Sequence, residues 1–139
     1  MGSKPSIRVV AAVIRNEGRF LITQRRPGAV LPLLWEFPGG QVEDGESDAH
    51  ALQREVRERL DVEIEIGAQM SIMQHEYPRY LVTLVIFAAR LPLGQHPRVA
   101  HIHDFRWVPS DDFDRYEFPP ADQATMDQLL GMPNESLVE

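Results

Sequence analysis

The chain has 139 residues and contains no cysteine. Disulfides, thiolate metal sites and cysteine nucleophiles are therefore excluded from its chemistry. Lysine is almost missing as well, since the chain has 13 arginines and Lys4 is its one lysine. Arginine suits bidentate contacts with phosphate, but so complete a bias is more typical of genome composition than of function.

The sequence also lacks long apolar runs and an excess of positive charge. Its longest apolar run, 81–89, is far shorter than the ~20 residues that cross a bilayer. The opening residues, MGSKPS, lack the apolar core of a secretion signal. The net charge of -7 argues against binding to nucleic acid or to membrane surfaces. We therefore expect a cytoplasmic protein without nucleic-acid or membrane partners, although a metal ion can still bridge acidic side chains to an anionic substrate.

What is present is an ordinary globular composition, 43% hydrophobic and 25% charged. The length predicts one domain, 1–139, with an ordered core at about 7–131. Apolar and alternating segments predict strands at 7–14, 19–24, 62–66 with a continuation over 70–74, 80–91 and 105–108. Helical periodicity and end signals predict helices at 46–60 and from the prolines at 119–120 to Gly131. This order favours an α+β fold with one mixed sheet between helices.

The stretch GGQVEDGE and the helix after it carry the candidate chemistry. Gly39 and Gly40 permit a close backbone approach to a ligand, and a carbonyl there can face a cation. Glu55 and Glu58 are one helical turn apart and lie beyond one edge of an apolar stripe. The stripe consists of Ala49, Leu52, Val56 and Leu60. Such oxygen ligands suit Mg²⁺ or Mn²⁺, which neutralise phosphate charge and acidify a bound water.

A simpler interpretation of the same helix stays open. Glu55 with Arg59, and Arg54 with Glu58, are i, i+4 pairs of opposite charge. A charged helix face of this kind is usually only a solvated surface. The flanking glycines and Glu46 are what favour a site over a solvated face.

Taken together, these residues resemble the Nudix family. Its signature is written G-x5-E-x7-R-E-U-x-E-E-x-G-U, with U apolar, and the chain fills seven of the nine set positions in register. These seven are Gly40, Glu46, Arg54, Glu55, Val56, Glu58 and Val62. The lead-in LWEFPGGQVEDGES, the first hairpin, the FRWV strand and the PPAD helix start are similar to the MutT-type branch. The resemblance extends over roughly 7–130.

The resemblance implies a Nudix-type mixed sheet sandwiched between helices. It also implies an enzyme that uses Mg²⁺ or Mn²⁺ to cleave a nucleoside diphosphate linked to another group. In the MutT-type branch the substrate is a nucleoside triphosphate, which becomes the monophosphate and pyrophosphate. By position, the carbonyl of Gly40 and the carboxylates of Glu55 and Glu58 would bind metal, and Glu55 could also activate water. Arg54 would hold the loop by pairing with Glu46.

The resemblance also implies substrate contacts outside the signature. Arg25 would reach the phosphates of the nucleotide. Asp122, in PPAD, stands where MutT-like proteins contact the base. Phe37 would line the same pocket.

Two positions inside the signature depart from it. Arg59 replaces a glutamate that binds metal in the family. Two unit charges of like sign at ~4 Å repel by about 4 kcal/mol at an effective dielectric constant of ~20. Arg59 could instead turn to Glu55, or contact a substrate phosphate as arginines do in phosphoryl transfer. Asp61 replaces a glycine that ends the helix in a left-handed conformation, which aspartate tolerates at modest cost.

A third departure lies in the loop HIHD, 101–104. Many MutT-like members carry a metal-reaching glutamate six residues before the tryptophan of the RWV strand, and that count from Trp107 ends at His101. The loop could form a small metal or phosphate site, Asp104 could supply the missing carboxylate, or the histidines could simply be solvated.

Two functions therefore remain open. The first is a metal-dependent pyrophosphohydrolase of a nucleoside triphosphate, with oxidised and cytosine nucleotides as candidates. The second is a catalytically weak or silent Nudix domain that binds a nucleotide or a protein, because Arg59 and His101 replace expected metal ligands. The apolar strand at 80–91 could also provide the edge of a homodimer.

Overall fold

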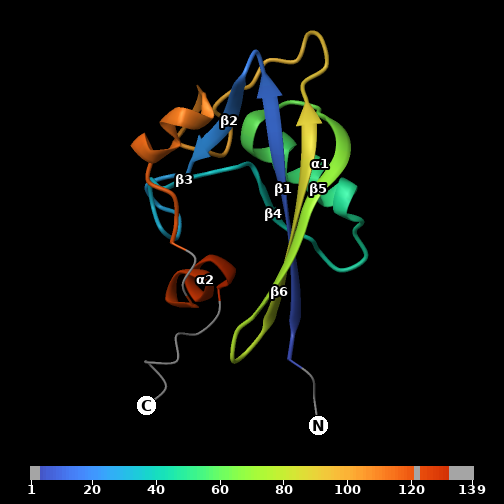
Figure 1. The fold of residues 1–139 in the computed structure, drawn as a ribbon, viewed down its shortest axis with the longest axis vertical. Coiled ribbons are helices and arrows are strands. Elements are labelled where there is room, and N and C mark those ends of the chain that lie inside the picture. Colours follow the sequence, from blue (N-terminus) through green and yellow to red (C-terminus); the bar gives the residue numbers. More distant parts are fainter. Residues whose placement is uncertain (1–3, 121–122, 132–139) are drawn as a thin grey trace.

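The structure is a computed structural model that describes residues 4–120 and 123–131. A mixed sheet of seven strands forms its centre (Figure 1). The strands are β1 (Ser6–Asn16), β2 (Arg19–Gln24), β3 (Trp35–Glu36), β4 (Gly39–Gln41), β5 (Glu65–Glu76), β6 (Leu81–Arg90) and β7 (Asp104–Val108). The helices are α1 (Asp48–Leu60), the 3-10 helix η1 (Ser110–Arg115) and α2 (Gln123–Leu130). Across the described ranges, no helix is both long and apolar enough to span a membrane.

The strand order is β3-β2-β1-β6-β5, with β4 also paired to β1 and β7 to β2. β1 and β6 run parallel over nine residue pairs, from Ser6↔Leu81 to Ile14↔Ala89, and the other pairings are antiparallel. The predicted α+β fold with a mixed sheet is therefore confirmed.

The hairpin of β1 and β2 joins the two halves of the sheet. Glu17 and Gly18 both have positive φ, 51° and 76°, and connect the strands through the predicted turn. The two strands pair only beside this turn, at Arg15↔Phe20 and Asn16↔Arg19. Further from the turn they diverge, and β1 pairs with β4 and β6 instead. This divergence opens a space between the two halves of the sheet.

Helices cover both faces of β1. Val10, Ala12 and Ile14 belong to the same buried core as the inward residues of α1. The alternate residues Ile7 and Val9 pack in a second cluster that includes Leu130 of α2. Because neighbouring residues of a strand point to opposite faces, the two helices lie on opposite sides of the sheet. The predicted arrangement of a sheet between helices is confirmed.

Helix α1 is fixed at both ends by local chemistry. The side chain of Ser47 accepts a hydrogen bond from the N–H of His50 at 3.1 Å, so the helix begins after Ser47 rather than at Glu46. Asp61 ends it in the left-handed conformation, with φ 55° and ψ 44°, and its N–H donates to the carbonyl of Arg57 at 2.9 Å. The aspartate therefore adopts the conformation that the missing glycine would favour.

Several sequence expectations need correction. The strand predicted at 62–66 begins only at Glu65 and runs to Glu76, with register irregularities between Ile66 and Ser71. Val62 and Ile64 are nevertheless buried, which explains the alternating pattern. Ala49 is exposed in the first turn of α1, and Ala51 is buried in its place. The apolar strand expected at 80–91 as a possible dimer edge is β6, which pairs with β1 on one side and β5 on the other and is not an edge of the sheet.

Candidate active site

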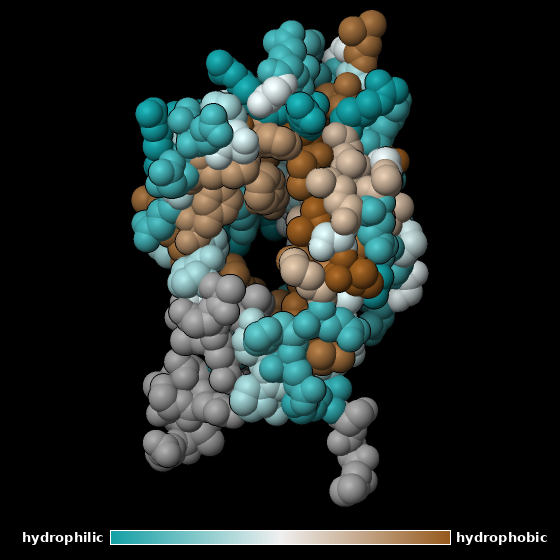
Figure 2. Space-filling view, viewed as in Figure 1, coloured by the Kyte–Doolittle hydropathy of each residue, from teal (hydrophilic) through white to brown (hydrophobic). Residues whose placement is uncertain are grey.

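A cavity of about 530 Å³ lies where β1 and β2 diverge. Its volume is that of a small-molecule site. Figure 2 shows this face of the molecule hollowed, with hydrophobic side chains along the walls. The apolar part is lined mainly by Val9 and Ala11 of β1, Val82, Leu84 and Ile86 of β6, Leu129 and Leu130 of α2, and Phe37 and Phe118. The charged side chains in the lining are Arg25, Glu36, Glu55 and Arg59.

One wall of the cavity is aromatic. The Phe37 ring meets Phe113 of η1 at 5.7 Å, nearly perpendicular, and Phe118 at 5.9 Å. Such a cluster provides rigid apolar surface. Neither η1 nor Phe118 was predicted, because their contacts with Phe37 join segments more than 70 residues apart in the chain. Asp122, the predicted base contact, lies outside the described residues.

Glu55 is held against the glycine strand β4. Gly39 must be glycine because a Cβ there would lie 2.0 Å from the carbonyl oxygen of Val10, and β4 could not approach β1 so closely. A Cβ on Gly40 would lie 2.5 to 2.7 Å from the carboxyl carbon and both oxygens of Glu55. The Glu55 side chain is only 14% exposed, and it follows buried Ala51 by one turn. The inward face of α1 is therefore wider than predicted, and Glu55 lies on it.

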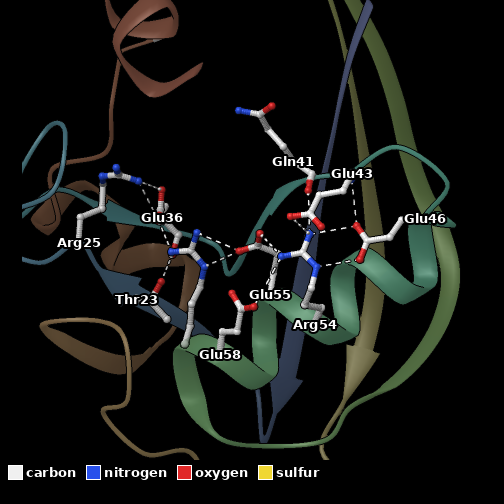
Figure 3. Close-up of polar contacts among 10 residues, drawn as sticks. Thr23, Arg25, Glu36, Gln41, Glu43, Glu46, Arg54, Glu55 and Glu58 are labelled. Atoms are coloured by element: carbon white, nitrogen blue, oxygen red, sulfur yellow. Dashed lines mark hydrogen bonds and ion pairs between the residues drawn. The ribbon is translucent and has the colours of Figure 1, made fainter. Parts of the chain in front are cut away.

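Arg54 joins the loop before α1 to Glu55 (Figure 3). Its guanidinium donates to both oxygens of Glu46, at 2.7 and 3.0 Å, and to the carbonyl of Gln41 at 3.1 Å. It also donates to Oε1 of Glu55 at 3.0 Å. The bonds from Arg54, with one from the backbone of Glu43, lower the pKa of Glu46 to about 2. The pKa of Arg54 is raised in turn, chiefly by Glu46.

Arg59 holds the other oxygen of Glu55. Its Nε and Nη2 lie 3.2 Å from Oε2 of Glu55, and its Nη1 lies 3.3 Å from Oε2 of Glu36. Glu36 in turn accepts from Nη1 of Arg25 at 3.3 and 3.4 Å. The alternating chain is thus Arg25–Glu36–Arg59–Glu55–Arg54–Glu46. Of the alternatives for Arg59, the structure shows the turn toward Glu55.

The carboxylates expected to bind metal are present but already contact arginines. Within 4–120 and 123–131, no three acidic or histidine side chains are grouped closely enough to hold an ion by themselves. Both Glu55 oxygens accept from arginines, and Glu58 is 57% exposed with one oxygen 3.8 Å from Nη1 of Arg54. The donor set of two carboxylates and the backbone of Gly40 nevertheless fits one hard divalent ion, which binds oxygen and retains waters and substrate oxygens.

His101 and Asp104 are turned to other partners. His101 is exposed, and its Nδ1 lies 3.3 Å from Nη1 of Arg26. The N–H groups of Ala100 and His101 both approach the carbonyl of Arg59 at 3.2 Å, so this loop caps the end of α1. The carboxylate of Asp104 pairs with Arg106 on its own strand. Neither side chain is in the cavity lining.

Sequence reasoning missed Glu36, which contacts both Arg25 and Arg59. It precedes Phe37 in the WEFPGG stretch, immediately before the glycine pair. The signal that could have identified Glu36 was its acidic side chain, next to a predicted site that contains the unexpected Arg59.

An α+β fold with a glycine strand, a glutamate-bearing helix and an apolar cavity with a charged end is typical of a domain that binds a small molecule. The chain matches the NUDIX domain over residues 9–128. It is 33% identical over 127 residues to the CTP pyrophosphohydrolase of Escherichia coli, covering 91% of this chain and 93% of that protein. It is also 33% identical over 129 residues to the 8-oxo-dGTP diphosphatase of Haemophilus influenzae, covering 91% and 93%. The solution structure of the E. coli ORF135 protein superimposes with a TM-score of 0.69 at 32% identity, covering 94% and 93%. The chain therefore belongs to the Nudix hydrolase family, in its MutT-like branch.

Proposed function

We propose that this protein is a divalent-metal-dependent pyrophosphohydrolase that converts a nucleoside triphosphate to the monophosphate and pyrophosphate. The observation that carries the proposal is the position of Glu55, fixed between Gly40 and Arg54 at the charged end of an apolar cavity. The relatives named above as CTP and 8-oxo-dGTP enzymes support it and favour cytosine and oxidised nucleotides as substrates. Because both relatives are named as enzymes, they do not favour the alternative of a catalytically silent binding domain.

Members of this family generally use Mg²⁺ or Mn²⁺. Bound here by the Gly40 carbonyl, Glu55 and Glu58, such an ion would neutralise phosphate charge and lower the pKa of a water. Arg54 keeps the Glu55 carboxylate oriented, because it also holds Glu46 and the carbonyl of Gln41. The role of Arg54 and Glu46 is therefore structural.

The remaining steps use the chain's own side chains. Glu55 accepts a proton from the attacking water, whose oxygen forms a bond to phosphorus while the bridging P–O bond breaks. The electron pair of that bond leaves with the pyrophosphate if water attacks the α phosphorus, and with the monophosphate if it attacks the β phosphorus. Arg25 binds the phosphates, and Phe37 with the aromatic wall receives the base. Asp122 is proposed to contact the base edge.

The test is a panel of canonical and oxidised nucleoside triphosphates, with Mg²⁺ and Mn²⁺ in parallel, and with pyrophosphate and monophosphate as measured products. Glu55→Gln should lower kcat by at least about 10²-fold, the usual contribution of a general base. Glu63→Gln is the matched control, because Glu63 is exposed and pairs with Arg57. The proposal fails if the wild-type protein turns over no nucleotide with either ion. Nucleotide binding in calorimetry without turnover would then support the silent domain.

A further inference from the structure

Two arginines from different elements face the same cavity with one carboxylate between them. Arg25 follows β2, Arg59 lies in the last turn of α1, and Glu36 ends β3. All three line the cavity. Their side chains are only 15% to 21% exposed, so their charges are less screened than those of surface pairs.

The bonds of Glu36 are longer than those of the structural pair nearby. Glu36 receives its arginine bonds at 3.3 to 3.4 Å, whereas Arg54 reaches Glu46 at 2.7 and 3.0 Å. Charge-assisted bonds are strongest at about 2.7–2.9 Å, so the contacts of Glu36 are the weaker set.

Each arginine also has an anchor that does not depend on Glu36. Nε of Arg25 donates to the carbonyl of Val30 at 2.6 Å. Arg59 contacts Glu55 through both Nε and Nη2 at 3.2 Å, against the one contact of Nη1 with Glu36. If Glu36 moved away, both guanidinium groups would keep a position beside the cavity with donors free.

We propose that Arg25 and Arg59 form a binding site for the phosphate chain that works without a metal ion, and that Glu36 occupies this site until phosphate displaces it. The proposal rests on the proposed function for its substrate. A guanidinium presents a planar set of donors that matches phosphate oxygens. Arg59 then supplies, as a fixed cation, charge neutralisation that phosphoryl-transfer enzymes otherwise draw from metal ions.

The charges predict opposite effects for two substitutions. Arg25, Arg59, Glu36 and Glu55 are the charged lining residues, and their charges cancel. Removing the charge of Glu36 leaves the cavity with a net positive charge and removes the competitor for both arginines. Removing the charge of Arg59 leaves it negative and takes away one of the two phosphate contacts.

The experiment is calorimetry with inorganic pyrophosphate in excess EDTA at fixed low ionic strength. We expect measurable binding by the wild-type protein, about tenfold weaker binding by Arg59→Gln and about tenfold tighter binding by Glu36→Gln. Each tenfold change corresponds to ~1.4 kcal/mol. Arg57→Gln is the matched control on the same helix, because Arg57 is 52% exposed and pairs with Glu63 outside the cavity. Its binding should equal that of the wild type.

The inference is overturned if the wild type does not bind pyrophosphate without metal, or if Arg59→Gln binds as tightly as Arg57→Gln. It is also overturned if Glu36→Gln weakens binding, since Glu36 would then position the arginines rather than compete with phosphate. Thermal unfolding of each variant distinguishes these outcomes from loss of the fold. Because no turnover is measured, failure here is distinct from failure of the proposed hydrolase activity.

Discussion

Gly40→Ala tests the close contact between β4 and Glu55 directly. The added methyl carbon would lie 2.5 Å from the Glu55 carboxyl carbon, whereas carbon atoms pack at about 3.5–4.0 Å. The carboxylate must therefore move by about 1 Å. Gly40 is not among the residues with positive φ, so its backbone accepts alanine without strain. The perturbation therefore acts on the Glu55 carboxylate and on its bonds from Arg54 and Arg59.

The size of the effect follows from that displacement. A misplacement of about 1 Å costs roughly 10²-fold in rate, or ~2.7 kcal/mol in the activation barrier. Stability should change much less, because two effects oppose each other. Alanine restricts the unfolded chain and stabilises the fold by about 0.4–1 kcal/mol, while weaker bonds from Arg54 and Arg59 to Glu55 destabilise it.

The assay compares kcat/KM for the best nucleotide of the panel with the free energy of unfolding in urea. Gly28→Ala is the control, because a Cβ there meets no atom within 4 Å and the residue does not have positive φ. We expect Gly28→Ala to keep wild-type activity and Gly40→Ala to lose about 10²-fold. Equal activity of the two variants would refute the argument that the position of Glu55 controls the reaction.

The remaining predictions concern stability. The pKa of Glu46 is lowered from 4.5 to about 2 in the folded chain. Its ionised carboxylate therefore stabilises the fold fully above about pH 4.5, and this stabilisation is lost as the pH falls toward 2. Urea unfolding across that pH range should show this loss in the wild type but not in Glu46→Gln. The prediction is contradicted if the free energy of unfolding falls equally steeply with pH in both proteins. Tyr80→Phe should lower the free energy of unfolding by about 1–3 kcal/mol, because the buried Tyr80 hydroxyl donates to buried Asp127 and the carboxylate would lose this hydrogen bond. Asp127→Asn keeps an acceptor and should cost less; an equal loss in both variants would contradict this, because the amide oxygen would then not replace the carboxylate as the acceptor.

The parts of the fold that were predictable carry their signal locally. Helix α1 has its apolar stripe, its Ser47 cap and its turn residue Asp61 within one short stretch. Strands β3 and β4 have only two and three residues, too few for a periodic pattern. They form because β3 pairs with β2 and β4 pairs with β1, and these pairings cannot be predicted from the residues of β3 and β4 alone.

The same distinction applies to the site. The pair of Arg54 and Glu46 is eight residues apart and could be predicted from the spacing of a known signature. The partner of Arg59 could not, because Glu36 is 23 residues away on β3 and meets Arg59 only in the folded chain. An altered signature position therefore says that the site has changed, but only the three-dimensional arrangement shows what the new side chain contacts.

The alternation of positive and negative groups from Arg25 to Glu46 has a consequence for the protein before it meets any ligand. In a cluster of glutamates without an ion, each carboxylate disfavours the ionised form of its neighbours. Here the guanidinium groups already balance Glu36, Glu55 and Glu46. In the folded chain these carboxylates therefore need no cation to balance their charge, and an arriving ion has to compete with arginine for a carboxylate that is already in place.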